Sequence, residues 1–164
     1  MHFSDDGRTL TILGDVTPGY DDRMVAALNA YPSVREVALG SDGGSVQDAL
    51  NAGLEIRKRK LDTVLFGDCF SACPLVFLGG VKRIVWSPYP KLGFHQVSER
   101  SGKAIALDDP LYDLIASYIH AMGADPTILL GYMFAAGPEQ IFVPEILNYC
   151  EGGLVTWGQR VCGG

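Results

Sequence analysis

The most constraining feature of this sequence is a repeated alternation of short strand-type runs with longer segments of helical spacing. Apolar runs of period two, or continuous apolar runs bounded by glycine or proline, predict strands, and apolar residues at i, i+3 and i+4 predict helices. A β-α-β-α-β order with short turns predicts an α/β fold, in which helices cover a mainly parallel sheet. The expected strands are residues 9–14, 34–39, 63–66, 82–86 and 91–95, and the expected helices are residues 20–31, 46–60, 74–78 and 108–122, with the final third helical until Gly152.

Length and charge exclude several classes of function. The chain has 164 residues, 48% of them hydrophobic, which is enough for one domain over residues 1–164 with a buried core. Its formal net charge is -6, and its one basic run, Arg57 to Lys60, lies where cations favour the end of a helix. Nucleic acid and anionic membrane surfaces are therefore not expected partners. No apolar run reaches the roughly 18 residues that cross a bilayer, so no membrane span is expected.

Four cysteines form two close pairs, Cys69 with Cys73 and Cys150 with Cys162. Two disulfides and four reduced, buried cysteines explain this spacing equally well. Neither pair has the C-x2-C spacing of a zinc site, so no metal is expected. Disulfides would indicate maturation in an oxidising compartment such as a periplasm. The first six residues lack the basic and apolar regions of a signal peptide, which leaves the compartment open.

Two turns after predicted strands are candidates for chemistry. One is the glycine-rich run 40–44, where Ser45 and Asp48 then form an S-x-x-D capping pattern, and the other contains Ser71. In parallel sheets, ligands bind beyond the carboxyl ends of the strands, and the N–H groups of a following helix favour negative charge there. Neither turn has the spacing of a P-loop or of G-x-G-x-x-G. No nucleotide or other cofactor is therefore expected.

A serine nucleophile needs a base, and His95 is the histidine that follows a strand pattern. His2 lies at the start of the chain and His120 lies late on a predicted helix, so both are weaker candidates. Ordinary structural roles are the alternative explanation for both Ser71 and His95. A serine before a helix commonly caps it, and a histidine next to Phe94 is commonly structural.

Three sequence blocks resemble the ClpP peptidase family and its crotonase-fold relatives, in the same order and at similar separations. The blocks are residues 40–46 (Gly-Ser-Asp-Gly-Gly-Ser-Val), 67–73 (Gly-Asp-Cys-Phe-Ser-Ala-Cys) and 92–96 (Leu-Gly-Phe-His-Gln). The resemblance covers about residues 9–156. It implies repeated β-β-α units in the α/β fold, a peptide or protein substrate and a homo-oligomer. With its two cysteines, the sequence around Ser71 resembles a bacterial, extracytoplasmic branch of ClpP-like proteins more than the rest of the family. This resemblance implies a periplasmic or otherwise extracytoplasmic location.

The resemblance also implies residue roles. Ser71 is the expected nucleophile, His95 the expected base, and the amides of Gly44 and Ala72 the expected oxyanion hole. Substrate is expected to contact three residues beside them, which are Gly43, Ser45 and Gln96.

One departure from the family concerns the triad acid. Where the family has an aspartate, this chain has Ala-Ala-Gly-Pro-Glu-Gln at residues 135–140, so Glu139 is the nearest carboxylate. Glu139 either orients His95 or is a solvated turn residue. The sequence therefore predicts a serine hydrolase, most simply a peptidase, with a Ser71-His95 dyad or triad. The alternatives are a catalytically silent peptide-binding protein or scaffold, which the missing aspartate favours, and a crotonase-type acyl-CoA enzyme.

Overall fold

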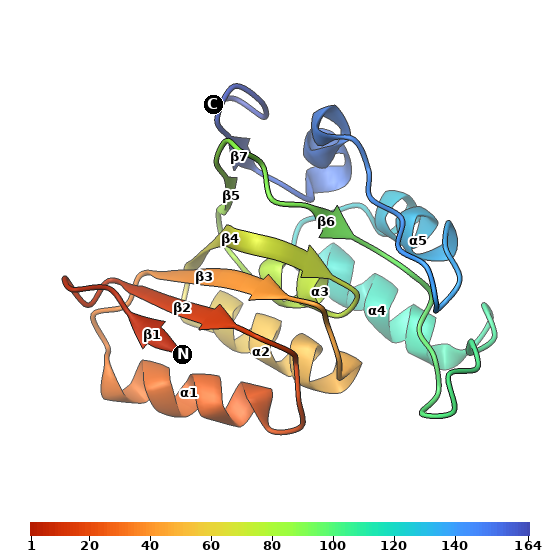
Figure 1. The fold of residues 1–164 in the computed structure, drawn as a ribbon, viewed down its shortest axis with the longest axis horizontal. Helices are drawn as coiled ribbons and strands as arrows, with labels where there is room; N and C mark the ends of the chain where they lie inside the picture. The colour runs from red at the N-terminus through yellow and green to blue at the C-terminus, as the bar shows by residue number, and fades with distance from the viewer.

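Six of the seven strands run parallel in a single mixed sheet, as the alternating pattern predicts. The computed structural model describes residues 1–164, and Figure 1 shows the sheet with its helices. The strand order is β1-β2-β3-β4-β5-β7, with β6 paired to β4, and only β1 is antiparallel to its neighbour. The strands are β1 (His2–Phe3), β2 (Thr9–Leu13), β3 (Glu36–Ser41), β4 (Asp62–Phe70), β5 (Arg83–Val85), β6 (Leu92–Gly93) and β7 (Trp157–Gly158).

The helices begin where the sequence supplies a cap. Side chains of Ser45, Asp109 and Asp125 accept hydrogen bonds from backbone N–H groups in the first turns of their helices. Figure 1 shows α1 and α2 below the sheet, with α3, α4 and α5 continuing this layer toward the end of the chain. The helices are α1 (Tyr20–Ala30), α2 (Val46–Lys58), α3 (Cys73–Phe77), α4 (Pro110–Ala121) and α5 (Pro126–Phe134), followed by a 3-10 helix (Ile146–Gly153).

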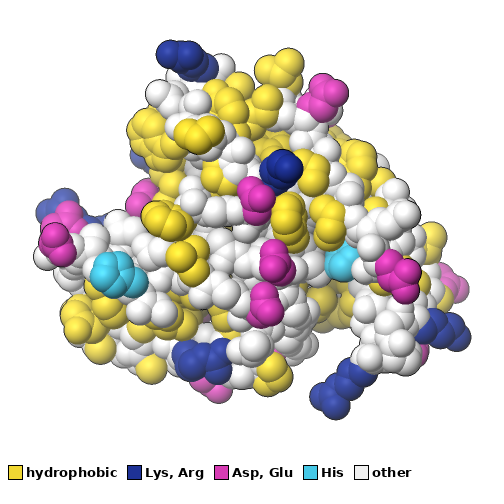
Figure 2. Space-filling view, viewed as in Figure 1, with side chains coloured by type: hydrophobic (Ala, Val, Ile, Leu, Met, Phe, Trp, Pro, Cys, Tyr) yellow, Lys and Arg dark blue, Asp and Glu magenta, His cyan; other side chains and the backbone are white.

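The core lies between the sheet and this helical layer. Alternation along β4 turns Leu65 into the core and leaves Phe66, which is 65% exposed, on the opposite face. Leu13 and Trp86 are also exposed large apolar side chains. In Figure 1 no helix covers the front of β2 to β4, and Figure 2 shows hydrophobic and acidic side chains mixed on that side.

Strand β4 is longer than predicted, and its length positions the site. The pattern predicts a strand that ends at residue 66, but β4 continues through Phe70. The register between β3 and β4 shifts between Leu39 and Ser41, and at this point Gly40 and Gly67 approach closely. A Cβ on Gly40 would lie 3.3 Å from the Gly67 Cα. Gly67 therefore marks an irregularity inside a strand and not its end.

The helical prediction for the final third is wrong between α5 and the 3-10 helix. Residues 135–145 form an irregular segment with one isolated bridge position, Phe142, because Gly137, Pro138 and Pro144 break the helical pattern. Phe142 instead exchanges two backbone hydrogen bonds of 2.8 Å with Phe94. None of the helices has both the length and the apolar character needed to span a bilayer.

Candidate active site

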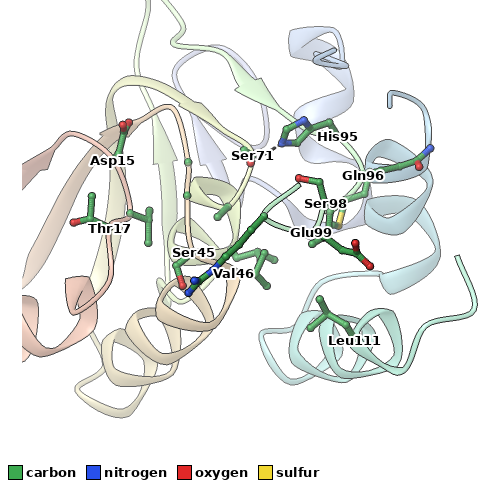
Figure 3. Close-up of a pocket in the computed structure, with 18 of the residues that line it drawn as sticks. Asp15, Thr17, Ser45, Val46, Ser71, His95, Gln96, Ser98, Glu99 and Leu111 are labelled. Carbon is green, nitrogen blue, oxygen red and sulfur yellow. Dashed lines mark hydrogen bonds between the residues drawn. The ribbon is translucent and has the colours of Figure 1, made fainter. Parts of the chain in front are cut away.

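The carboxyl ends of β3, β4 and β6 meet at one edge of the sheet, where a cleft of about 740 Å³ opens. Figure 3 shows Ser71, His95 and Ser45 around this cleft, each on a turn or extended segment that follows a strand. This is the edge at which parallel sheets bind ligands. The structure therefore brings together the three blocks that the sequence analysis singled out.

Ser71 occupies the turn between β4 and α3. Its backbone φ is 62°, which is the left-handed region that side-chain-bearing residues seldom adopt. Its N–H donates to the Gly93 carbonyl at 3.0 Å, so the turn is anchored to β6. This conformation directs the hydroxyl into the cleft, where Oγ lies 2.6 Å from Nε2 of His95.

The other ring nitrogen of His95 determines which tautomer is present. Nδ1 lies 2.8 Å from the carbonyl oxygen of Pro138. A carbonyl oxygen only accepts hydrogen bonds, so Nδ1 carries the proton and donates it. Nε2 then has a free lone pair and accepts from the Ser71 hydroxyl. The geometry therefore holds the imidazole in the tautomer that a general base requires.

The segment that carries Pro138 is held along the strand end that carries His95. On one side of His95, Phe94 pairs with Phe142, and on the other the Gln96 N–H donates to the Ala136 carbonyl at 3.0 Å. These bonds bracket the Pro138 carbonyl between two anchored positions. The breaks in the helical pattern after α5 thus have a role, because they let the chain return along the segment that follows β6 and carries His95.

Glu139, the expected third member, is exposed and makes no hydrogen bond to His95. The position that a triad acid would occupy is taken by the backbone carbonyl of the preceding residue. Sequence reasoning missed Pro138 because a backbone carbonyl carries no side-chain signal. The only available clue was the Gly-Pro pair, which indicates a break in the helix.

The glycine turn after β3 packs directly against the serine. A Cβ on Gly43 would overlap the Cβ of Ser71, and a Cβ on Gly44 would overlap the Val16 carbonyl oxygen. Both glycines also have positive φ, of 106° and 143°. The turn therefore needs glycine at both positions for close approach as well as for backbone conformation.

Two amides that face this cleft have no partner inside the protein. The N–H groups of Gly44 and Ala72 make no hydrogen bond to backbone or side chains, although their neighbours Gly43 and Ser71 do. Both residues line the cleft, and Ala72 is only 2% exposed. Unpaired N–H groups at the start of a helix are suited to bind negative charge. These are the two amides that the resemblance implied.

Ser45 serves mainly as a cap. Its hydroxyl accepts from the Asp48 N–H at 3.2 Å and contacts the Asp48 carboxylate, and this contact lowers the pKa of Asp48. Ser45, Gly43 and Gln96 all line the cleft, where the resemblance placed substrate.

The cleft wall combines apolar and charged groups. Many of its apolar side chains come from four helices, as Val46 and Leu111 show in Figure 3 for two of them, and its exposed rim carries charges of both signs. The apolar members from helices are Val46, Leu75, Leu111 and Met133, and the charged members are Asp15, Glu99 and Arg100. No group of three or more histidine, cysteine or acidic side chains is placed to hold a metal ion.

All four cysteines are paired. Cys69 is bonded to Cys73 across the Ser71 turn, and Cys150 is bonded to Cys162 near the end of the chain. Of the two explanations that the spacing allowed, the structure has the disulfides. His2 lies in β1, and the exposed His120 lies in the last turn of α4, so neither lines the cleft.

Comparison with solved structures identifies the fold. No family model and no curated protein sequence matches the chain. ClpP1 from Listeria monocytogenes superposes with a TM-score of 0.69 at 16% identity, covering 94% of this chain and 92% of that chain, and a mutant of the same protein gives 0.69 at 19% with the same coverage. A mutant of 1510-N, a membrane-bound stomatin-specific protease, gives 0.64 at 15%, covering 95% of this chain and 80% of that chain. At these identities the likeness concerns the fold alone, and it confirms that the chain has the ClpP-like α/β fold.

Proposed function

We propose that this protein is a serine hydrolase, most simply a peptidase, with Ser71 as nucleophile and His95 as general base. The observation that carries the proposal is the chain of contacts from Ser71 Oγ to His95 Nε2, and from His95 Nδ1 to the Pro138 carbonyl oxygen. The first contact lies within hydrogen-bond reach, and the second fixes the productive tautomer. One of the solved structures that share the fold is named a protease, and the three sequence blocks resemble the ClpP peptidase family, which together favour a peptide bond as the target.

The reaction proceeds by acyl transfer. Ser71 Oγ attacks the substrate carbonyl carbon while its proton moves to Nε2 of His95, and the carbonyl oxygen becomes an oxyanion near the free N–H groups of Gly44 and Ala72. The imidazolium returns the proton to the leaving amine, which leaves an acyl ester on Ser71. Water, activated by His95 in the same way, then hydrolyses the ester. Throughout, Nδ1–H stays bonded to Pro138, where a neutral carbonyl stabilises the imidazolium less than a carboxylate does.

The volume of the cleft is suitable for a short segment of a polypeptide substrate. A volume of about 740 Å³ lies within the range of sites that enclose several side chains or a small ligand. An extended peptide would place its scissile carbonyl at Ser71 and one side chain against the apolar wall formed by α2, α3, α4 and α5. Homo-oligomer formation follows only from the resemblance and stays a prediction, which sedimentation of the purified chain tests.

The test is covalent labelling by a fluorophosphonate, followed by intact-mass analysis. We expect one adduct per native chain and none in Ser71→Ala or His95→Ala. Ser117→Ala and His120→Ala are matched controls, because both residues are exposed on α4 outside the cleft, and both variants should label like the native chain.

Labelling that persists in Ser71→Ala would contradict the assignment of the nucleophile. A folded native chain that never labels but binds peptides would instead indicate the silent binding protein. Binding of a coenzyme A thioester without labelling would indicate the acyl-CoA enzyme.

A further inference from the structure

The Cys69–Cys73 disulfide closes a small ring of the backbone around the proposed nucleophile. It joins residues separated by four positions, and Ser71 is at the centre of the enclosed segment. Cys69 belongs to β4, where it pairs with Leu92 of β6, and Cys73 is the first residue of α3. The bridge thus connects the end of the strand to the start of the helix across the serine.

The turn inside this ring needs support. A left-handed backbone costs a residue with a side chain about 1–2 kcal/mol. Helix α3, with five residues, is too short to fix the turn by its own hydrogen bonds. Ser71 has one backbone anchor to β6, through its N–H, and the next amide, of Ala72, has no internal partner. The disulfide adds a covalent constraint to the turn that keeps Ser71 at this φ with Oγ next to His95.

The burial of the bridge indicates a permanent constraint. Cys69 is 0% and Cys73 1% exposed, so a reductant reaches neither sulfur without local opening. A small loop also restricts the unfolded chain less than a large one, so this bridge contributes less global stability by chain entropy than a longer one would. Its strongest effect is therefore expected in the native state, on the turn that it encloses.

We propose that the Cys69–Cys73 disulfide is a positioning element of the active site, which holds Ser71 and the Ala72 amide in their reactive arrangement. The inference rests on the proposed function, since it concerns the reactivity of Ser71. Full activity then requires the bridge, and the chain becomes a competent hydrolase only after two thiols have been oxidised to a disulfide by an external thiol oxidant, which takes up two electrons and two protons. The enzyme would be weakly active in a reducing compartment.

The second disulfide provides a matched control within the same chain. Cys150–Cys162 joins the 3-10 helix to the C-terminal residues, encloses a longer segment, and has no residue in the cleft wall. Both of its cysteines are partly exposed. Its removal is therefore expected to lower the melting temperature without changing the chemistry at Ser71.

The experiment compares the fluorophosphonate labelling rate of the native chain with that of Cys69→Ala/Cys73→Ala and Cys150→Ala/Cys162→Ala, together with their melting temperatures. We expect labelling of Cys69→Ala/Cys73→Ala to be slower by about tenfold or more, because the nucleophile turn is no longer pre-organised. The control pair should label at the native rate even where its melting temperature falls. Equal labelling of all three folded proteins would overturn the positioning role and leave the proposed function intact.

A second measurement covers the case in which Cys69→Ala/Cys73→Ala does not fold. The folded native chain is treated with increasing reductant, alkylated and mapped by mass, and labelling is measured at each stage. The partly exposed Cys150–Cys162 bridge should open first without loss of labelling, and labelling should fall in step with opening of Cys69–Cys73. Labelling that survives complete opening of Cys69–Cys73 would overturn the inference. A native, oxidised chain that does not label at all would overturn the proposed function and this inference with it.

Discussion

The backbone carbonyl of Pro138 accepts a hydrogen bond from Nδ1 of His95 at 2.8 Å, in the position that a triad carboxylate would occupy. Two functions of a triad acid are thereby separated. The carbonyl keeps the imidazole in the correct tautomer and orientation, but it supplies no negative charge for the imidazolium. Because tautomer and orientation contribute to the effect of the acid, we expect the proposed dyad with its carbonyl partner to retain part of the rate enhancement of a triad.

Replacing Glu139 tests this separation directly. Glu139→Gln should change the labelling rate of Ser71 by less than about twofold, because the exposed carboxylate makes no contact with His95 and surface changes of this kind have small effects. His95→Ala should lower the rate by about a thousandfold or more, as loss of a catalytic base does. A large decrease in Glu139→Gln, with an unchanged melting temperature, would show that the carboxylate acts on the imidazole.

The fold was predictable because its signals are local and redundant. Helix α2 illustrates this, since the Ser45 cap, the apolar stripe and the basic last turn all indicate one helix. The structure begins it at Val46 as predicted and ends it at Lys58, slightly before the predicted end at residue 60. Strand β1 was not predicted, because His2 and Phe3 are too few to show a period. The end of β4 was placed too early, because a glycine at an irregularity and a glycine at a strand end look alike in sequence.

The candidate site likewise has parts that the sequence predicts and parts that it does not. The candidate catalytic side chains Ser71 and His95 have a sequence signal, and the three blocks meet in one cleft. Two other parts of the site have no sequence signal. The Pro138 carbonyl depends on long-range pairing between Phe94 and Phe142, and the choice between disulfides and thiols depends on a distance that spacing does not determine.

Alkaline pH should destabilise the protein through its buried tyrosines. Burial raises the pKa of Tyr118, whose hydroxyl donates to the Leu75 carbonyl. Because the pKa of this phenol is raised in the folded state, its stabilising effect is complete below its unfolded pKa of about 10. As the pH rises further, the unfolding free energy falls by up to about 1.4 kcal/mol per pH unit. Tyr118→Phe should therefore flatten the decline in unfolding free energy above this pH. Tyr31→Phe, at an exposed tyrosine, should leave the slope unchanged, and equal slopes in both variants would contradict the assignment.

Arg83 should contribute strongly to stability. It is 3% exposed, and its guanidinium donates to the carbonyls of Gly80, Met122 and Gly153, which lie at or near the ends of helices. Burial lowers its pKa to about 10, and the carbonyl contacts replace water around the charged group. Arg83→Met should cost about 2 kcal/mol or more, because the Gly153 and Leu154 carbonyls lose their side-chain donor, while Gly80 and Met122 keep only the donor from Arg57. Urea unfolding measures the loss, and a decrease below about 1 kcal/mol would show that water replaces the guanidinium.

Gly43 should be sensitive to substitution, because it packs directly against the proposed nucleophile. Gly43→Ala adds a Cβ that overlaps the Ser71 Cβ at a residue whose φ is 106°, so the new methyl group displaces the nucleophile turn. We expect fluorophosphonate labelling to fall by about a hundredfold or more, since a shift of about 1 Å in a reacting group has an effect of this size. Gly131→Ala is the matched control: this glycine lies within α5 with open space around its Cβ position, so the change should leave labelling unchanged and stabilise the protein by about 0.5–1 kcal/mol. If Gly43→Ala labelled at the native rate, Ser71 would not need the backbone position in which the structure holds it, and the dyad geometry on which the proposed mechanism depends would lose its support.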